Sequence, residues 1–174
     1  ANYSFASGTT SFDALAIMNK KFVSQHLLQP ISVAGKPYSQ YEVLTVASLL
    51  QIESDPADFA HVAGIIYHRL AISMPLQLNS TVQYAINTRG KIQLATAQTR
   101  IPSKYNTYLN LGLPPTPISL PSAKAIQAAE NPISTTDLYF LTVAPADTRF
   151  TSSYKQFQDW VILYNQNVRK GLFK

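Results

Sequence analysis

An apolar segment that ends in a carboxylate constrains the fold of this chain more than any other feature. Seven of the eleven residues from Val43 to Glu53 are valine, leucine, alanine or isoleucine, and the nearest charged residue on the N-terminal side is Glu42. This composition predicts a buried helix over about 39–53. A carboxylate at the end of such a helix is costly to desolvate unless it is exposed, paired or protonated.

Glu53 therefore has two interpretations. In the structural one, its side chain simply meets solvent at a helix end, and the local pattern alone favours this interpretation because most such residues are structural. In the functional one, desolvation raises the pKa of the carboxyl group, as a general acid near neutral pH requires.

The composition narrows the classes of partner. The chain has 174 residues, which suggests one domain, and only 13% of them are charged, about half the usual fraction. Its polarity comes instead from hydroxyl and amide side chains, which suit neutral ligands such as sugars. The net charge is +5, but the basic residues are scattered and the densest groups are pairs. Nucleic acid is therefore not an expected partner.

Several kinds of chemistry have no sequence support. Cysteine is absent, which excludes disulfides, cysteine-ligated zinc and a cysteine nucleophile. The three histidines, His26, His61 and His68, lack a close metal-binding spacing. Phosphate-binding glycine loops and the serine-hydrolase motif are also absent. We therefore expect no metal and no cofactor.

Hydrophobic spacing and capping residues predict four further helices and one hairpin. The expected elements are a helix from Thr10 or Ser11 to about Gln29, a loop over Pro30–Pro37, a helix with Asp55 as N-cap and Pro56 in its first turn, a short helix over Ser122–Glu130, strands over Asp137–Ala144 and Arg149–Ser152, and a last helix that follows Ser152 or Ser153 and ends at Gly171. Five prolines from Pro102 to Pro121 predict a long ordered loop. We expect an α+β fold, with helices packed around a small sheet or hairpin and this loop lining an active-site cleft.

The order of several short motifs resembles the YceG-like, or MltG, family of endolytic murein transglycosylases. The matching segments are Ala47–Glu53, Val62–Leu70, Met74–Gln77 with Ser80–Val82, Tyr105–Tyr108, Gly112–Ile118, Ala128–Pro132 and Leu138–Phe140. Each segment alone is weak, but the set in this order and spacing is specific. The resemblance covers roughly residues 41–157.

The resemblance implies that Glu53 is the catalytic acid and base. Many family members carry Glu-Lys-Glu where this chain has Gln51-Ile52-Glu53, so only the second glutamate is present. Amide, hydroxyl and aromatic side chains near the other motifs are the candidates for substrate binding: Gln77, Asn79, Thr81, Tyr105, Asn106 and Thr107. For Asn106 and Thr107, support of the loop backbone is an equally good interpretation. For Tyr105, Tyr108 and Trp160, core packing is the alternative.

The family pattern is not followed everywhere. Leu78-Asn79-Ser80-Thr81 stands where the family often has Ser-Asp-Pro-Thr, and Thr116 replaces a usual glycine. Thr148 and Phe157 stand at positions that are often histidine. These differences affect the expected substrate contacts more than the expected class of reaction.

The implied reaction cleaves the β-1,4 bond between N-acetylmuramic acid and N-acetylglucosamine without water and leaves a 1,6-anhydro end. An ordinary glycoside hydrolase needs two carboxylates, whereas this chain offers one good candidate. The substrate's own 6-hydroxyl would replace the second group. Three alternatives remain: a water-using muramidase with Asp55 or Asp58 as the second carboxylate, a non-catalytic glycan-binding or scaffold domain, and a structural module of a larger assembly.

The resemblance also implies a place for the chain. We expect residues 1–174 to form one catalytic domain, with a helical lead-in over 1–40 and the core motifs over 41–174. A transmembrane helix and a LysM-like part would lie upstream of this sequence and hold it at the extracytoplasmic face of a bacterial membrane. The expected partners are peptidoglycan glycan strands and the peptidoglycan-synthesis machinery.

Overall fold

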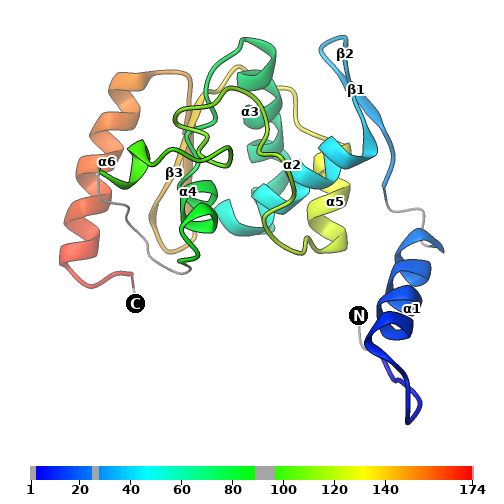
Figure 1. Cartoon of the computed structure of the whole chain (residues 1–174). Helices are drawn as coiled ribbons and strands as arrows, with labels where there is room; N and C mark the ends of the chain where they lie inside the picture. The colour runs from blue at the N-terminus through cyan, green and yellow to red at the C-terminus, as the bar shows by residue number, and fades with distance from the viewer. Residues whose placement is uncertain (1–2, 25–27, 89–96, 174) are drawn as a thin grey trace.

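The computed structural model describes residues 3–24, 28–88 and 97–173. Within these ranges the fold is α+β, as expected, with helices and two antiparallel two-stranded sheets (Figure 1). The elements are α1 (Ser11–Ser24), β1 (Ile31–Val33), β2 (Lys36–Tyr38), α2 (Gln40–Glu53), α3 (Phe59–Ala71), α4 (Asn79–Ala85), the 3-10 helix η1 (Gln98–Arg100), α5 (Ala123–Glu130), β3 (Tyr139–Ala144), β4 (Asp147–Thr151) and α6 (Tyr154–Arg169). None of the described helices is long and apolar enough to cross a bilayer.

The core lies where α2 packs against α3 and α5. The apolar run of α2 is buried as expected, and Val46, Leu49 and Leu50 have no exposed surface. Ser39 caps α2, because its hydroxyl accepts the backbone N–H of Glu42 while the Glu42 carboxylate accepts the N–H of Ser39. This reciprocal pair fixes the start of the helix, and therefore also the position of its last residue, Glu53.

The segment after α5 crosses α3 at very close range. The backbone N–H of Ile133 donates to the carbonyl oxygen of Ala60 at 2.9 Å. A Cβ atom placed on Gly64 would overlap the carbonyl oxygen of Ile133. Glycine at position 64 therefore allows the chain to pass over α3 on its way to the second hairpin.

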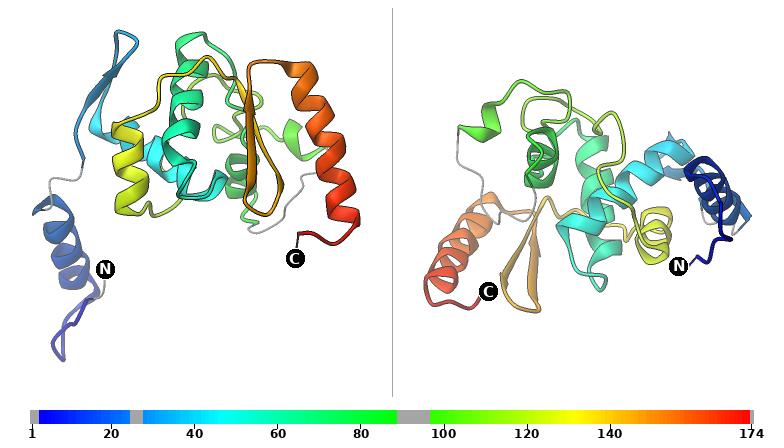
Figure 2. Two further views of the ribbon diagram at one scale, coloured as in Figure 1. Left: turned by 180° about the vertical axis from the view of Figure 1, so that it is seen from behind. Right: turned by 60° about the horizontal axis from the view of Figure 1, so that its bottom comes forward.

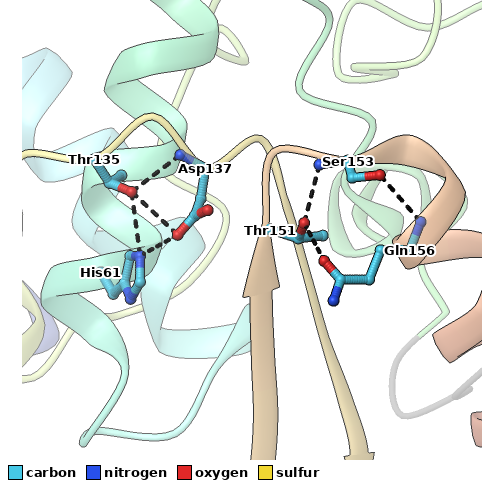
Figure 3. A network of polar contacts seen from close by, with 6 residues as sticks. All are labelled: His61, Thr135, Asp137, Thr151, Ser153 and Gln156. Atoms are coloured by element: carbon cyan, nitrogen blue, oxygen red, sulfur yellow. Dashed lines mark hydrogen bonds and ion pairs between the residues drawn. The ribbon is translucent and has the colours of Figure 1, made fainter.

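Two polar networks fasten the β3–β4 hairpin at its open end (Figure 3). On the α3 side, the His61 ring contacts the Asp137 carboxylate at 2.9 Å, and Thr135 donates to the same carboxylate. On the α6 side, the Thr151 hydroxyl donates to the Gln156 side chain at 2.6 Å. The hairpin is thus held between α3 and α6, and α6 lies along it at the end of the molecule away from α1 (Figure 2).

The N-terminal part differs from expectation. Helix α1 begins after Thr10, which caps it, and is described as far as Ser24, and none of its described residues is buried. Residues 28–29 are not helical, so the helix does not extend to Gln29. It stands apart from the helical body in Figure 1 and in the left view of Figure 2. The expected loop after Pro30 is instead a small hairpin, β1–β2. Its turn residues Ala34 and Gly35 both have positive φ, 50° and 78°, as tight hairpin turns require.

The structure corrects the predicted start of one helix and confirms two other helices and the second hairpin. Helix α3 begins at Phe59, because residues 55–58 form a separate turn in which the Asp58 N–H donates to the Asp55 carbonyl oxygen. Asp55 is therefore not its N-cap, and Pro56 precedes the helix. Helix α4 and η1 were not expected from the sequence. The helices capped by Ser122 and Ser153 are confirmed, and so is the second hairpin, although its strands span 139–144 and 147–151 rather than 137–144 and 149–152.

Candidate active site

Glu53 is the last residue of α2, and its side chain lines a cleft with a volume of about 860 Å³. We call this cavity the main cleft. Its described lining residues come from α2, α3, the segment before α4, α4 itself, η1, the proline-rich loop, β3, α6 and the C-terminal end: Glu53, Arg69, Gln77, Leu78, Asn79, Thr99, Tyr108, Phe140, Leu141, Thr142, Phe157, Val161, Tyr164, Asn165 and Phe173. The functional interpretation of Glu53 requires such a setting.

The carboxylate of Glu53 has one hydrogen bond from the backbone. Its Oε1 atom accepts the N–H of Ser80, in the first turn of α4, at 3.1 Å. Burial raises the pKa of the Glu53 carboxyl group above its ordinary value, and proximity to Ser80 and Arg69 opposes part of that rise. Since the Ser80 hydroxyl has no hydrogen-bond partner in the described structure, we assign the direct contact to the N–H alone. A carboxyl group held in this way suits proton donation near neutral pH.

Arg69 is a site residue that the sequence reasoning missed. Its side chain is 7% exposed and lines the main cleft. Its Nε atom donates to the carbonyl oxygen of Leu138 at 2.7 Å, and Nη1 donates to that of Leu76 at 2.6 Å. The signal in the sequence was an arginine three residues after Ile66, on the apolar face of α3. Arg69 therefore places a positive charge beside Glu53 and joins both walls of the cleft.

Gln77 and Asn79, two of the expected substrate-binding residues, lie in the main cleft with Glu53. Gln77 has a positive φ of 50°, and its N–H donates to the Thr107 carbonyl oxygen at 3.0 Å. The Oδ1 atom of Asn79 accepts a hydrogen bond from the Tyr108 hydroxyl at 2.6 Å. This contact fixes the orientation of the Asn79 side-chain amide, including its NH₂ group. Tyr108 also lines the cleft, so its role extends beyond the core packing considered from the sequence.

The other expected binding residues lie beneath or beside the main cleft, and their contact with substrate stays a prediction. Thr81 and Thr107 are buried and their hydroxyls are 2.9 Å apart, while Thr107 Oγ1 also accepts the N–H of Leu78. Asn106 has no exposed surface, and its amide bonds to the carbonyl oxygens of Thr99 and Ile101. These contacts match the alternative interpretation, in which the residues support the loop backbone.

Tyr105 points elsewhere in the same loop. Its hydroxyl bonds to that of Thr116 at 2.9 Å, and its ring packs against Tyr84 with the ring centroids 4.9 Å apart. Of residues 102–121, only Tyr108 lines the main cleft. The expectation that the whole proline-rich loop lines the active site therefore stays a prediction.

The wall opposite the α4 side is largely apolar and aromatic. It is built from Phe140 and Leu141 on β3 and from Phe157, Val161 and Tyr164 on α6. Core packing was the alternative interpretation for Trp160 on the same helix, and Trp160 is indeed buried at 9% exposure. Aromatic rings beside amide groups form a surface that suits the faces and hydroxyl edges of sugars.

The sequence model of the YceG-like family matches residues 1–162. This chain belongs to the YceG-like family. Its fold resembles the crystal structure of a YceG-like protein from Listeria monocytogenes, with a TM-score of 0.70 and 26% sequence identity, over 90% of this chain and 51% of that one.

Two sequence relatives of this YceG-like chain are both named endolytic murein transglycosylase. The protein of Bacillus subtilis (strain 168) is 34% identical over 158 residues, which is 90% of this chain and 44% of the relative. The protein of Streptococcus pneumoniae (strain ATCC BAA-255 / R6) is 35% identical over 146 residues, which is 81% of this chain and 26% of the relative. The chain thus spans less than half the length of these relatives.

The acidic residues of this YceG-like chain are not paired in the main cleft. Among the described lining residues, Glu53 is the one carboxylate, and neither Asp55 nor Asp58 belongs to that set. His61 bonds to Asp137 and His68 lines a different cavity, while His26 lies outside the described residues. The described part of the chain contains no group of three or more histidine or acidic side chains placed to hold a metal ion.

Proposed function

We propose that this chain is the catalytic part of an endolytic lytic transglycosylase. Its substrate is the glycan strand of peptidoglycan, and its product carries a 1,6-anhydro-N-acetylmuramic acid end. The observation that carries the proposal is a single carboxylate with a raised pKa in a large cleft lined by amide, hydroxyl and aromatic groups. The names of the relatives support the same class of reaction.

The single carboxylate limits the mechanism. Inverting glycosidases use a second carboxylate to activate water, and retaining ones use it as the nucleophile. Since no second acid lines the main cleft in the described residues, we assign the nucleophile to the substrate. The 6-hydroxyl of the muramyl residue lies on the ring that is attacked, so it acts at high effective concentration.

Glu53 then serves both proton transfers. The protonated carboxyl group donates its proton to the glycosidic oxygen as the bond from C1 to that oxygen breaks. The 6-hydroxyl oxygen forms the new bond to C1, and the Glu53 carboxylate takes up the hydroxyl proton. The acid is regenerated in its starting form, and no water is consumed.

The neighbours of Glu53 have defined parts in this scheme. The Ser80 N–H and the Arg69 charge stabilise the carboxylate that forms after the first proton transfer. Gln77 and the Asn79 amide, fixed by Tyr108, provide hydrogen bonds for acetamido and hydroxyl groups. The rings of Phe157 and Tyr164 provide faces for the sugar.

A non-catalytic glycan-binding domain is the second candidate, and the replacement of the first motif glutamate by Gln51 motivates it. Gln51 does not line the main cleft, and its Oε1 accepts the N–H of Ser122 at 2.8 Å at the start of α5. Gln51 therefore has a structural role at the start of α5. This role favours Glu53 as the catalytic acid, and it favours an enzyme over a non-catalytic binding domain.

The test is mass spectrometry of the products that the chain releases from purified peptidoglycan. We expect anhydromuramyl ends with the parent chain and none with Glu53→Gln, while Glu42→Gln, at the other end of α2, retains the product. Binding without products from the parent would favour the binding domain. Products with a free reducing end would favour the water-using muramidase.

The position in the cell belongs to the same proposal. A glycan-strand substrate places the chain on the extracytoplasmic face of a bacterial membrane, beside the peptidoglycan-synthesis machinery. Protease accessibility in intact spheroplasts tests the first part, and crosslinking from surface positions of the full-length protein tests the second.

A further inference from the structure

A second, smaller cavity lies next to the main cleft, on the other side of the contact between α2 and α4. It has a volume of about 210 Å³, and we call it the side cavity. Its described lining residues come from the end of α2, from α4 and from the end of the proline-rich loop: Ile52, Ser80, Gln83, Tyr84, Thr88, Ile118 and Ser119. The volume exceeds that of one water molecule several-fold, since a water occupies about 30 Å³ of liquid.

The two cavities are lined by residues that are neighbours in the chain. On α2, Glu53 lines the main cleft and Ile52 lines the side cavity. On α4, Asn79 lines the main cleft, whereas Ser80 and Tyr84 line the side cavity. The Ser80 N–H that bonds to Glu53 therefore sits at the boundary, and a linear polymer whose scissile bond lies at Glu53 extends naturally toward both.

The side cavity contains hydroxyl groups that lack partners. The oxygen atoms of Ser80 and Thr88 are buried and make no hydrogen bond within the described structure. Buried polar groups are nearly always satisfied, so unsatisfied ones indicate water or a ligand. Hydroxyls both donate and accept, which suits the amide and hydroxyl groups of an acetamido sugar.

The rim of the side cavity is apolar. Ile52 is 48% exposed and Tyr84 is 38% exposed, although both are large hydrophobic side chains. The Tyr84 ring is supported from one side by Tyr105. A partly exposed aromatic ring that packs against a neighbouring ring is a suitable platform for the apolar face of a pyranose.

The charges distinguish the two cavities. None of the seven described residues that line the side cavity is charged, whereas Arg69 lines the main cleft. A sugar with a lactyl acid or a peptide stem carries carboxylates, and these are attracted by the arginine of the main cleft but meet no positive charge among the described residues of the side cavity. An uncharged amino sugar has no carboxylate, so it gives up no attraction to Arg69 when it binds in the side cavity.

We propose that the side cavity is a subsite for one uncharged N-acetylated hexosamine residue of the strand whose scissile bond lies at Glu53. The proposal rests on the proposed function, because it assigns the ligand of an extension of the same site. It also gives part of the proline-rich loop, at Ile118 and Ser119, a place in substrate binding. The strand then crosses α4 with its acidic, peptide-bearing residue on the Arg69 side.

The test uses the Glu53→Gln variant, which holds substrate without cleaving it, with labelled isoleucine, leucine and valine methyl groups. Tri-N-acetylchitotriose, an uncharged oligomer, is titrated and followed by NMR. We expect saturable shifts of the Ile52 and Ile118 methyl signals, while Leu141 and Val161 report on the main cleft. Adding Tyr84→Ala is expected to weaken binding about tenfold, as loss of one stacking contact would. Tyr41→Ala, at an exposed tyrosine outside both cavities, is expected to leave affinity unchanged.

A second pair of variants probes the hydroxyls without removing an aromatic ring. Thr88→Val keeps the side-chain shape and is expected to weaken chitotriose binding about fivefold, as loss of one hydrogen bond would. Thr136→Val, at an exposed threonine that lines neither cavity, is the matched control. A native-like methyl spectrum of each unliganded variant shows that the fold is retained.

The outcomes separate this inference from the proposed function. Shifts confined to Leu141 and Val161, or affinity unchanged by Tyr84→Ala, would overturn the subsite and leave the lytic reaction standing. Shifts at Ile52 and Ile118 without anhydro products from the parent chain would support the subsite and contradict the reaction. Absence of any saturable shift at millimolar chitotriose would overturn the subsite.

Discussion

The backbone N–H of Ser80 donates a hydrogen bond of 3.1 Å to Oε1 of Glu53, although the two residues are 27 positions apart in the chain. This bond joins the last residue of α2 to the first turn of α4. It fixes the direction of the one carboxylate in the described lining of the main cleft. It also stabilises the charged form of that carboxylate, so the pKa rises less than burial alone would require.

The first prediction concerns the pH dependence of stability at the two ends of α2. Burial raises the pKa of Glu53, so the folded state loses stability as pH rises from the ordinary glutamate pKa through the raised value. Glu53→Gln removes this penalty. The variant is expected to gain free energy of unfolding relative to the parent as pH increases from 4 to 8.

Glu42 is the matched control with the opposite sign. Hydrogen bonds from Ser39 lower the pKa of Glu42, so its contribution is present above the ordinary glutamate pKa and lost as pH falls through the lowered value. Glu42→Gln is expected to cost about 1 kcal/mol at pH 7 and less at low pH. Urea unfolding from pH 3 to 8 measures the free energy of unfolding of both variants. If the pH dependence of that free energy is the same in Glu53→Gln and in the parent, position 53 does not hold a buried carboxylate.

The second prediction concerns Arg69, which binds two carbonyl oxygens on separate segments. Arg69→Met keeps a long apolar side chain but leaves the oxygens of Leu138 and Leu76 without their donor. The free energy of unfolding is expected to fall by about 3 kcal/mol, because hydrogen bonds to charged groups contribute about 1.5–3 kcal/mol each. Thermal and urea denaturation report the loss.

Arg149→Met is the control for charge. Arg149 pairs with Asp147 at 2.8 Å on the exposed part of the hairpin, and such pairs contribute little. A similar loss of stability in both variants would show that positive charge, rather than the buried hydrogen bonds, is what matters at position 69.

The third prediction concerns Gly64. A methyl group there would overlap the Ile133 carbonyl oxygen, so Gly64→Ala has to displace the segment that leads to β3. The cost is expected to be about 3 kcal/mol, which is at the upper end for overpacking. Gly35→Asn is the control, since Gly35 has open space around it and asparagine tolerates positive φ. Equal melting temperatures for Gly64→Ala and the parent would disprove the close passage.

The elements that the sequence predicted well carry their signals locally. The helices that begin after Ser39, Ser122 and Ser153 each have a serine whose hydroxyl accepts an N–H three residues ahead. Such a contact needs only neighbouring residues, so it can be predicted without knowledge of the fold.

The elements that were missed or misplaced depend on distant contacts. Helix α4 has Leu78 at its N-cap position with no side-chain cap. Two N–H groups at its start bond to distant side chains instead. The Leu78 N–H donates to the Thr107 hydroxyl, and the Ser80 N–H donates to the Glu53 carboxylate. Residues 55–58 show the converse, because a strong local start signal formed a turn instead and α3 began at Phe59.

The sequence by itself determined that an apolar helix ends in Glu53, that the fold is α+β and that the motifs resemble one family. Only the tertiary structure decided which polar side chains face the cleft. Gln77 and Asn79 reach it, Thr81 and Asn106 lie below it, and Arg69 enters it from α3. The physical reason is that a polar side chain bonds to whichever partner the fold brings near, and for Arg69 one such partner lies 69 positions away along the chain.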